Sequence, residues 1–136
     1  MAVTRQEINP PGLNVRMRDG FVTMAQVVTI EGGKRQIFLS GQVPRDADGK
    51  CVGVGDMRAQ IIHVSECIKA GLEAAGATLA DVVRTQTFVT DMDEFLKHAD
   101  LRARYFSNPL ATSTTVEVRR LVHPDFLVEI EVQAIV

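Results

Sequence analysis

The segment LVEIEVQAIV, residues 127–136, alternates apolar and polar side chains and decides the kind of sheet that the chain must build. Successive side chains of a β-strand point to opposite faces, so the alternation predicts a strand with two unlike faces. The apolar face carries Val128, Ile130, Val132 and Ala134. The polar face carries Glu129, Glu131 and Gln133. Such a strand belongs to a sheet that buries one face and presents the other to water or to another subunit.

Two helices are predicted to cover the apolar face. The first runs from about Asp56, a good N-cap residue, to Gly76, which can take the left-handed conformation after a helix end. Its apolar residues recur at three- and four-residue steps. The second spans about Met92 to Phe106, with Asp91 as its cap and Glu94 three residues later as the partner of a capping box.

Four further strands are predicted at residues 21–30, 36–43, 81–90 and 113–122. Gly32 and Gly33 predict a hairpin turn between the first two, and a second hairpin is expected to join 113–122 to the terminal strand. In 113–122, Val116 is expected on the buried face and Thr115 on the polar face, which Thr85 or Gln86 would join.

The resulting order is ββαβαββ, an α+β fold with an antiparallel-rich sheet and both helices on one face. The length of 136 residues fits one domain, 1–136, in which residues 1–20 form an irregular lead-in.

Composition excludes several classes of function. The net charge of −2 gives no electrostatic footprint for nucleic acid or for an anionic membrane. Cys51 and Cys67 are interpreted as free thiols, and no Cys or His cluster predicts a metal site. No stretch is long and apolar enough to span a membrane, and the first residues lack the apolar core of a signal peptide. We therefore expect a cytoplasmic protein without metal.

Five segments occur together, in order, and cover most of the chain after residue 26: IFLSGQVP (37–44), DMRAQ (56–60), GLEAAGATLADVVRTQTFVTDMDEF (71–95), TTVEVRRL (114–121) and LVEIEVQAIV (127–136). Together they resemble the reactive intermediate deaminase (RidA/YjgF) family. The resemblance implies a chorismate-mutase-like subunit and a homotrimer whose sheets form a central barrel, with a small-molecule pocket at each subunit boundary. It also implies hydrolysis of reactive enamines and imines, such as 2-aminoacrylate, without a metal or organic cofactor.

Three positions depart from the archetype of that family. Ser113 stands where the resemblance places the arginine that grips the substrate carboxylate, Met24 where it places a tyrosine, and Ala99 where it places an asparagine. A serine is short, neutral and has one donor, so it cannot replace an arginine fork. We expect binding of a small imino acid in its transition state to be at least ~10–100-fold weaker, and hence inefficient hydrolysis of 2-aminoacrylate.

Glu131 is the candidate catalytic residue, because the resemblance implies a water-positioning glutamate there and a carboxylate can orient water and shuttle a proton. The alternative is a structural carboxylate paired with an arginine of the next subunit. Ser40 and Gly41 are candidates for binding substrate through a hydroxyl and a backbone N–H, or form only a strand-end turn.

Three more residues are candidates for substrate binding. Thr115 would line the same pocket or serve only as a β-forming residue, and Ser113 occupies the position of the missing arginine. Arg102 is either a relocated anion anchor or an exposed helix arginine paired with carboxylates near Asp100. Two functions remain open: a hydrolase of an imine, an enamine or a related small carbonyl compound, and a trimer that binds a small molecule without chemistry. A ribonuclease has little support, because the chain has no Trp and only one Tyr to stack on bases.

Overall fold

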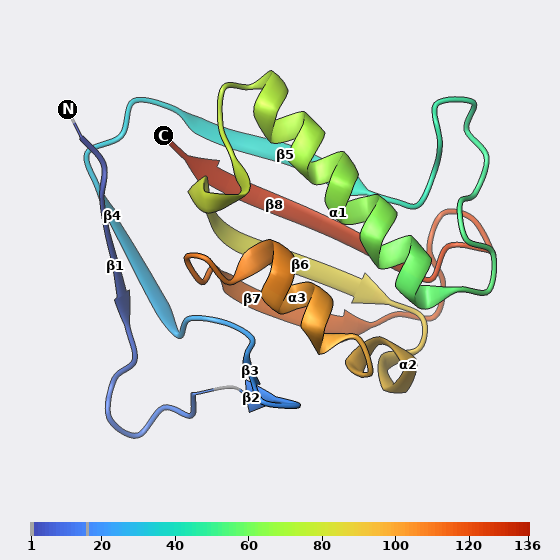
Figure 1. Cartoon of the computed structure of the whole chain (residues 1–136), viewed down its shortest axis with the longest axis horizontal. Helices are drawn as coiled ribbons and strands as arrows, with labels where there is room; N and C mark the ends of the chain where they lie inside the picture. The colour runs from blue at the N-terminus through green and yellow to red at the C-terminus, as the bar shows by residue number, and fades with distance from the viewer. Residues whose placement is uncertain (1, 16) are drawn as a thin grey trace.

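The computed structural model describes residues 2–15 and 17–136. Its centre is a four-stranded sheet in the order β5-β8-β6-β7. The strands are β5 (Gln36–Gln42), β6 (Val82–Val89), β7 (Thr112–Glu117) and β8 (Val128–Ile135). Strand β8 runs antiparallel to both of its neighbours, and β7 runs parallel to β6. Helices α1 (Met57–Ala74) and α3 (Ala99–Phe106) lie on one face of this sheet (Figure 1).

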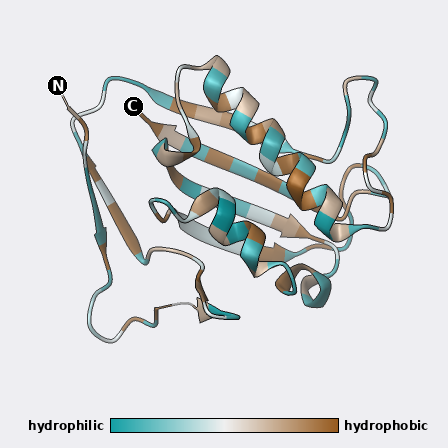
Figure 2. Ribbon diagram, viewed as in Figure 1, coloured by the Kyte–Doolittle hydropathy of each residue, from teal (hydrophilic) through white to brown (hydrophobic). Residues whose placement is uncertain are grey.

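The alternation in the terminal strand has the predicted effect. Along β8 the residues from Val128 to Ala134 are buried at every second position, and the residues between them are half-buried. Figure 2 shows the same alternation of apolar and polar residues along that strand. The buried side chains pack against α1, whose Val64, Ile68 and Leu72 are fully buried. This apolar layer is the core of the protein.

The first predicted helix is confirmed at both ends. The Asp56 carboxylate accepts a hydrogen bond from the Ala59 backbone N–H at 3.0 Å, and Gly76 has a φ of +78°. The second predicted helix is divided into α2 (Met92–Leu96) and α3, so the prediction of one continuous helix over 92–106 is wrong. Asp91 caps α2 as expected, but the Glu94 carboxylate contacts Lys97 and His98. These contacts lie at the end of α2, where the chain turns into α3.

The two predicted hairpins are wrong. Gly32 and Gly33 do have positive φ values of +79° and +88°. However, the strand before them, β4 (Val27–Glu31), pairs with β1 (Thr4–Ile8), while β5 pairs with β8. Likewise β7 pairs with β6, which separates it from β8. Turn residues set the local backbone, but they do not decide which strands pair.

Strand β1 lies in the segment that was expected to be an irregular lead-in. Its Arg5 side chain donates hydrogen bonds to the backbone carbonyls of Ala80, Val82 and Leu110 at 3.2, 2.9 and 2.6 Å. These bonds fasten the β1–β4 ribbon beside the main sheet (Figure 1). Two short strands, β2 (Met17–Arg18) and β3 (Phe21–Val22), precede β4.

The faces of β7 are the reverse of the prediction. Thr115 pairs with the buried Thr87 on the helix-covered face, and Val116 is 40% exposed on the other face. On β6, Thr85 is buried under the helices, whereas Gln86 shares the opposite face with Glu131. We call that opposite face the open face. No described helix is long and apolar enough to cross a membrane.

Candidate functional site

The open face carries the candidate catalytic residue. Glu131 lies on β8 opposite Gln86 of β6. With the Gln86 amide oriented to satisfy its neighbours, its nitrogen donates to a Glu131 carboxylate oxygen and its oxygen accepts from Arg84 Nη2 at 2.9 Å. Glu131 is thus linked to an arginine of its own chain through an amide and held in a defined orientation. The orientation of Glu131 therefore does not require an arginine from a partner subunit, which was the alternative interpretation.

Ser40 and Gly41 lie beside Glu131. The register of β5 and β8 pairs Leu39 with Val132 and Gln42 with Ile130, so two residues of β5 stand opposite Glu131 alone. This is a β-bulge, a feature often found next to active sites. A Cβ atom on Gly41 would collide with the Glu129 carboxylate, so any larger residue here would have to displace that carboxylate from its present position.

Glu129 places a second carboxylate on the same face, two residues before Glu131. Burial raises the pKa of Glu129, and the negative charge of Glu131 raises it further. A raised pKa favours the protonated form of Glu129, and a carboxyl group in that form can act as a general acid. The alternation along residues 127–136 places Glu129 on this face but indicates no catalytic role for it. We call Ser40, Gly41, Gln86, Glu129 and Glu131 the open-face cluster.

A cavity of about 390 Å³ lies on the other side of the sheet, under α2, α3 and the β2–β3 segment. We call it the helix-side cavity. Most of its wall is apolar and includes Met24, Ile61, Phe95, Leu101, Phe106 and Ile130. The polar part of the wall includes Ser65, Thr87, Arg102, Ser113 and Thr115. Cavities of this size and polarity are typical of sites for small organic molecules.

Arg102 reaches this cavity from α3. Its Nε donates to the Thr23 carbonyl at 2.8 Å, and its guanidinium carbon lies 5.3 Å from the centre of the Phe106 ring. Its Nη2 atom is fully buried and has no hydrogen-bond partner among the described residues. Burial lowers the pKa of Arg102 to about 10, so the side chain remains charged at neutral pH. The interpretation of Arg102 as an exposed, carboxylate-paired arginine is therefore wrong.

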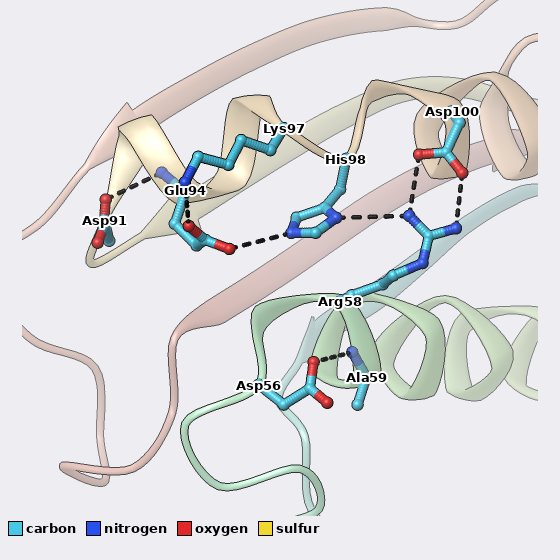
Figure 3. A network of polar contacts seen from close by, with 8 residues as sticks. All are labelled: Asp56, Arg58, Ala59, Asp91, Glu94, Lys97, His98 and Asp100. Atoms are coloured by element: carbon cyan, nitrogen blue, oxygen red, sulfur yellow. Dashed lines mark hydrogen bonds and ion pairs between the residues drawn. The ribbon is translucent and has the colours of Figure 1, made fainter.

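Arg58 is the arginine that pairs with Asp100, through two hydrogen bonds of 3.0 and 2.6 Å (Figure 3). The same arginine lies 3.4 Å from His98 Nδ1, and His98 Nε2 lies 3.4 Å from Glu94. Because arginine can only donate, Nδ1 is the acceptor and Nε2 carries the proton. His98 also lines the helix-side cavity. Sequence analysis found no function for this histidine.

The predicted site residues therefore form two groups on opposite faces of the sheet. Glu131, Ser40 and Gly41 belong to the open-face cluster, whereas Ser113, Thr115 and Arg102 line the helix-side cavity. Met24 and Ala99 also line that cavity. All three positions that depart from the archetype therefore line the helix-side cavity. Among the described residues, no three His, Cys, Asp or Glu side chains are placed to hold a metal ion.

Comparisons with known proteins agree with this architecture. The model of the family described as Endoribonuclease L-PSP matches residues 23–136. A RutC family protein of Pyrococcus horikoshii is 40% identical over 95 residues, which cover 70% of this chain and 75% of that protein. The crystal structure of the Rid family protein YyfB of Yersinia pestis, whose function is unknown, has a TM-score of 0.82 at 31% identity and covers 97% of this chain and 98% of that one. RidA of an Antarctic Psychrobacter has a TM-score of 0.68 at 28% identity, over 85% and 88% of the two chains.

The chain belongs to the Endoribonuclease L-PSP family, which is the Rid (YjgF) family, and has its chorismate-mutase-like α+β fold.

Proposed function

We propose that this protein hydrolyses a reactive imine or enamine, or a related small carbonyl compound, without a cofactor. The observation that carries the proposal is the Ser40–Gly41 bulge opposite Glu131, with a second carboxylate beside it whose pKa is raised. Family membership and the likeness to RidA of Psychrobacter support the same reaction class.

The reaction needs one water and one acid–base group. Glu131, as a carboxylate, takes a proton from water as the water oxygen attacks the imine carbon, and the C=N electron pair moves to nitrogen, which then receives that proton from Glu131. The resulting carbinolamine passes its hydroxyl proton through Glu131 to the nitrogen, and its C–N bond then breaks, releasing ammonia and leaving a C=O group. An enamine first takes a proton on carbon to become the imine. The Ser40 hydroxyl and the backbone at the bulge would orient the substrate and the water.

The substrate would bind in a pocket shared by two copies of the chain. The open-face cluster and the helix-side cavity lie on opposite faces of one subunit, so one chain does not bring them together. Strand β7, which carries Ser113 and Thr115, is an edge strand of the four-stranded sheet. On the open face, Phe38 is 70% exposed and Val116 is 40% exposed. These features support a homotrimer in which the open face of one subunit meets the cavity of the next.

A second function is binding of a small molecule without chemistry. The observation that favours it is the helix-side cavity itself, which has a buried arginine and a volume for a ligand but no carboxylate among the described residues of its wall. Ser113 in place of the arginine of the archetype lowers the expected affinity for 2-aminoacrylate under either function, and its expected turnover if the protein is a hydrolase. We do not extend the family's ribonuclease description to this chain, because a net charge of −2 gives no basic surface for RNA.

Ammonia release distinguishes the two functions. The enzyme is supplied with imines generated in situ, from small 2-imino acids to branched and aromatic ones. We expect Glu131→Gln to lower the rate at least ~100-fold, a typical effect of removing a general base. Glu73→Gln, an exposed glutamate of α1, is the matched control and should leave the rate unchanged. No release from folded protein with any imine would reject hydrolysis and leave the binding function.

A further inference from the structure

The helix-side cavity contains two buried polar atoms without a partner among the described residues: Arg102 Nη2 and Ser65 Oγ. Native proteins leave few buried polar groups unpaired, and those that remain call for an explanation. Here the two atoms come from different helices, α3 and α1, and line the same space. A bound ligand that accepts hydrogen bonds would satisfy both.

Arg102 is held in place for such a ligand. The bond from Nε to the Thr23 carbonyl fixes one edge of the guanidinium, and the Phe106 ring supports its plane. The Nη2 atom of the same guanidinium is buried without a partner among the described residues, in a side chain that lines the cavity. A side chain fixed in this way loses little freedom when a ligand binds.

No acidic side chain neutralises Arg102 among the described residues. The ion pairs in the described part of the chain involve Arg58, Lys97, His98 and His123 as the basic partners. Burial is the cause of the lowered pKa of Arg102, and no neighbouring carboxylate offsets it. A buried positive charge without a counter-charge is costly, so an anionic ligand is the natural partner.

The remainder of the wall defines the rest of the ligand. Met24, Phe95, Leu101 and Phe106 offer apolar and aromatic surface, and the cavity volume of about 390 Å³ far exceeds what a three-carbon acid fills. The hydroxyl groups of Ser113 and Thr115 lie on the β7 side of the same space. The expected ligand therefore has one carboxylate and a bulky apolar body.

We infer that Arg102 is the carboxylate anchor of this protein and takes over the task of the arginine that Ser113 replaces. The ligand class is a 2-imino acid, or the corresponding 2-oxo acid product, with a branched aliphatic or aromatic side chain. The assignment of these ligands as substrate and product rests on the proposed function, but the binding itself does not. Arg102 and the apolar wall together select such acids over 2-aminoacrylate.

The test is calorimetric titration of the full-length protein with stable 2-oxo acids. The probes are 4-methyl-2-oxopentanoate, phenylpyruvate and pyruvate, with the methyl ester of 4-methyl-2-oxopentanoate as the uncharged control. We expect both bulky acids to bind at least about tenfold more tightly than pyruvate and than the ester. Equal affinity for acid and ester, or no binding of either bulky acid at millimolar concentration, would overturn the inference.

The matched variants are Arg102→Met, which keeps the volume and removes the charge, and Arg104→Met, at an exposed arginine two residues away on α3. We expect Arg102→Met to weaken binding of the bulky acids at least about tenfold and Arg104→Met to leave it unchanged. Circular dichroism confirms that each variant is folded, and Arg102→Gln, which also removes the charge, replaces Arg102→Met if the latter is not. Wild-type affinity in the Arg102 variant would contradict the inference.

Failure of the two proposals can be separated. Binding of bulky acids that depends on Arg102, without ammonia release, would leave the anchor intact and reject hydrolysis. Ammonia release that depends on Glu131 but is unchanged in Arg102→Met would support hydrolysis and reject Arg102 as the carboxylate anchor.

Discussion

At the scale of single residues, the proposed anchor lies at a different position from the arginine that the archetype carries. Ser113 on β7 and Arg102 on α3 line the same cavity, so a guanidinium can reach this space from the helix when the strand position is a serine. The structural cost is visible in the unpaired Nη2 atom. Functional sites commonly keep such unfavourable features because ligands need them.

This cost leads to a prediction about stability. Arg102→Met removes a buried, unneutralised charge and keeps the contact with Phe106, at the loss of one hydrogen bond to Thr23. We expect the free energy of unfolding in urea to stay within about 1 kcal/mol of wild type, or to rise. A fall of more than about 2 kcal/mol would mean that Arg102 is a structural residue.

Glu129 gives a prediction about pH. Its pKa is raised in the folded protein, so the native state holds this proton more tightly than the unfolded chain. Stability must therefore fall as pH rises from the ordinary pKa of a glutamate towards the raised native value. Glu129→Gln has no such proton to lose. We expect thermal melts to show the variant gaining stability relative to wild type across this pH window, with a constant difference above it. A difference that is the same at every pH would contradict the raised pKa.

At the scale of elements, Gln60 fastens α1 to the two loops that flank the sheet. Its fully buried side chain donates to the Gly53 and Asp125 carbonyls at 3.0 and 2.8 Å and accepts from the Leu127 N–H at 2.7 Å. Leu127 directly precedes β8. The bond therefore fixes the start of the strand that carries Glu129 and Glu131.

Gln60→Leu should keep the volume and remove three buried hydrogen bonds to the backbone; the Gly53 carbonyl keeps its bond from the Asp56 N–H, whereas the Leu127 N–H loses the partner that Gln60 provides. We expect a loss of about 2–4 kcal/mol in the free energy of unfolding, measured by urea denaturation. Gln6→Leu, on the exposed side of β1, is the control and should change stability by less than about 0.5 kcal/mol. An equally small effect of Gln60→Leu would show that water replaces these bonds.

Much of the element content could be predicted from sequence because it depends on local signals. The cap at Asp56, the glycine at Gly76 and the alternation in β8 each act within a few residues. Strand pairing depends on residues far apart in the sequence, such as Arg5, whose hydrogen bonds hold β1 to the Ala80–Val82 turn. No local sequence pattern predicts such contacts. The division of the second helix could not be predicted either, because a capping signal describes only the first turn of a helix.

The candidate site, too, could be predicted from sequence only where it depends on local signals. Alternation places Glu131 on the polar face, and the Ser40–Gly41 pair falls beside it. The separation of Ser113 and Thr115 from Glu131 depends on the parallel register of β7 on β6, which places Thr115 beside Thr87 under the helices. The cavity itself needs the β2–β3 segment to fold over α3, a long-range contact without a sequence signature.

At the scale of the whole molecule, the two halves of the proposed site on opposite faces require assembly. We expect sedimentation equilibrium to give three times the chain mass of 14.9 kDa. Phe38→Asp, at the 70%-exposed aromatic residue of the open face, should dissociate the assembly and abolish ammonia release together. An active monomer would show that one chain holds a complete site.

Subunit mixing tests the shared pocket most directly. Glu131→Gln and Arg102→Met are each expected to release little ammonia from a bulky 2-imino acid. When the two variants are unfolded together and refolded as mixed assemblies, some pockets pair an intact Glu131 with an intact Arg102 from different chains. The account predicts recovery of up to about a quarter of wild-type activity at equal mixing, as expected for a cyclic assembly with shared sites. Mixtures no more active than the separate variants, although assembled and folded, would contradict a catalytic pocket formed by two copies of this chain.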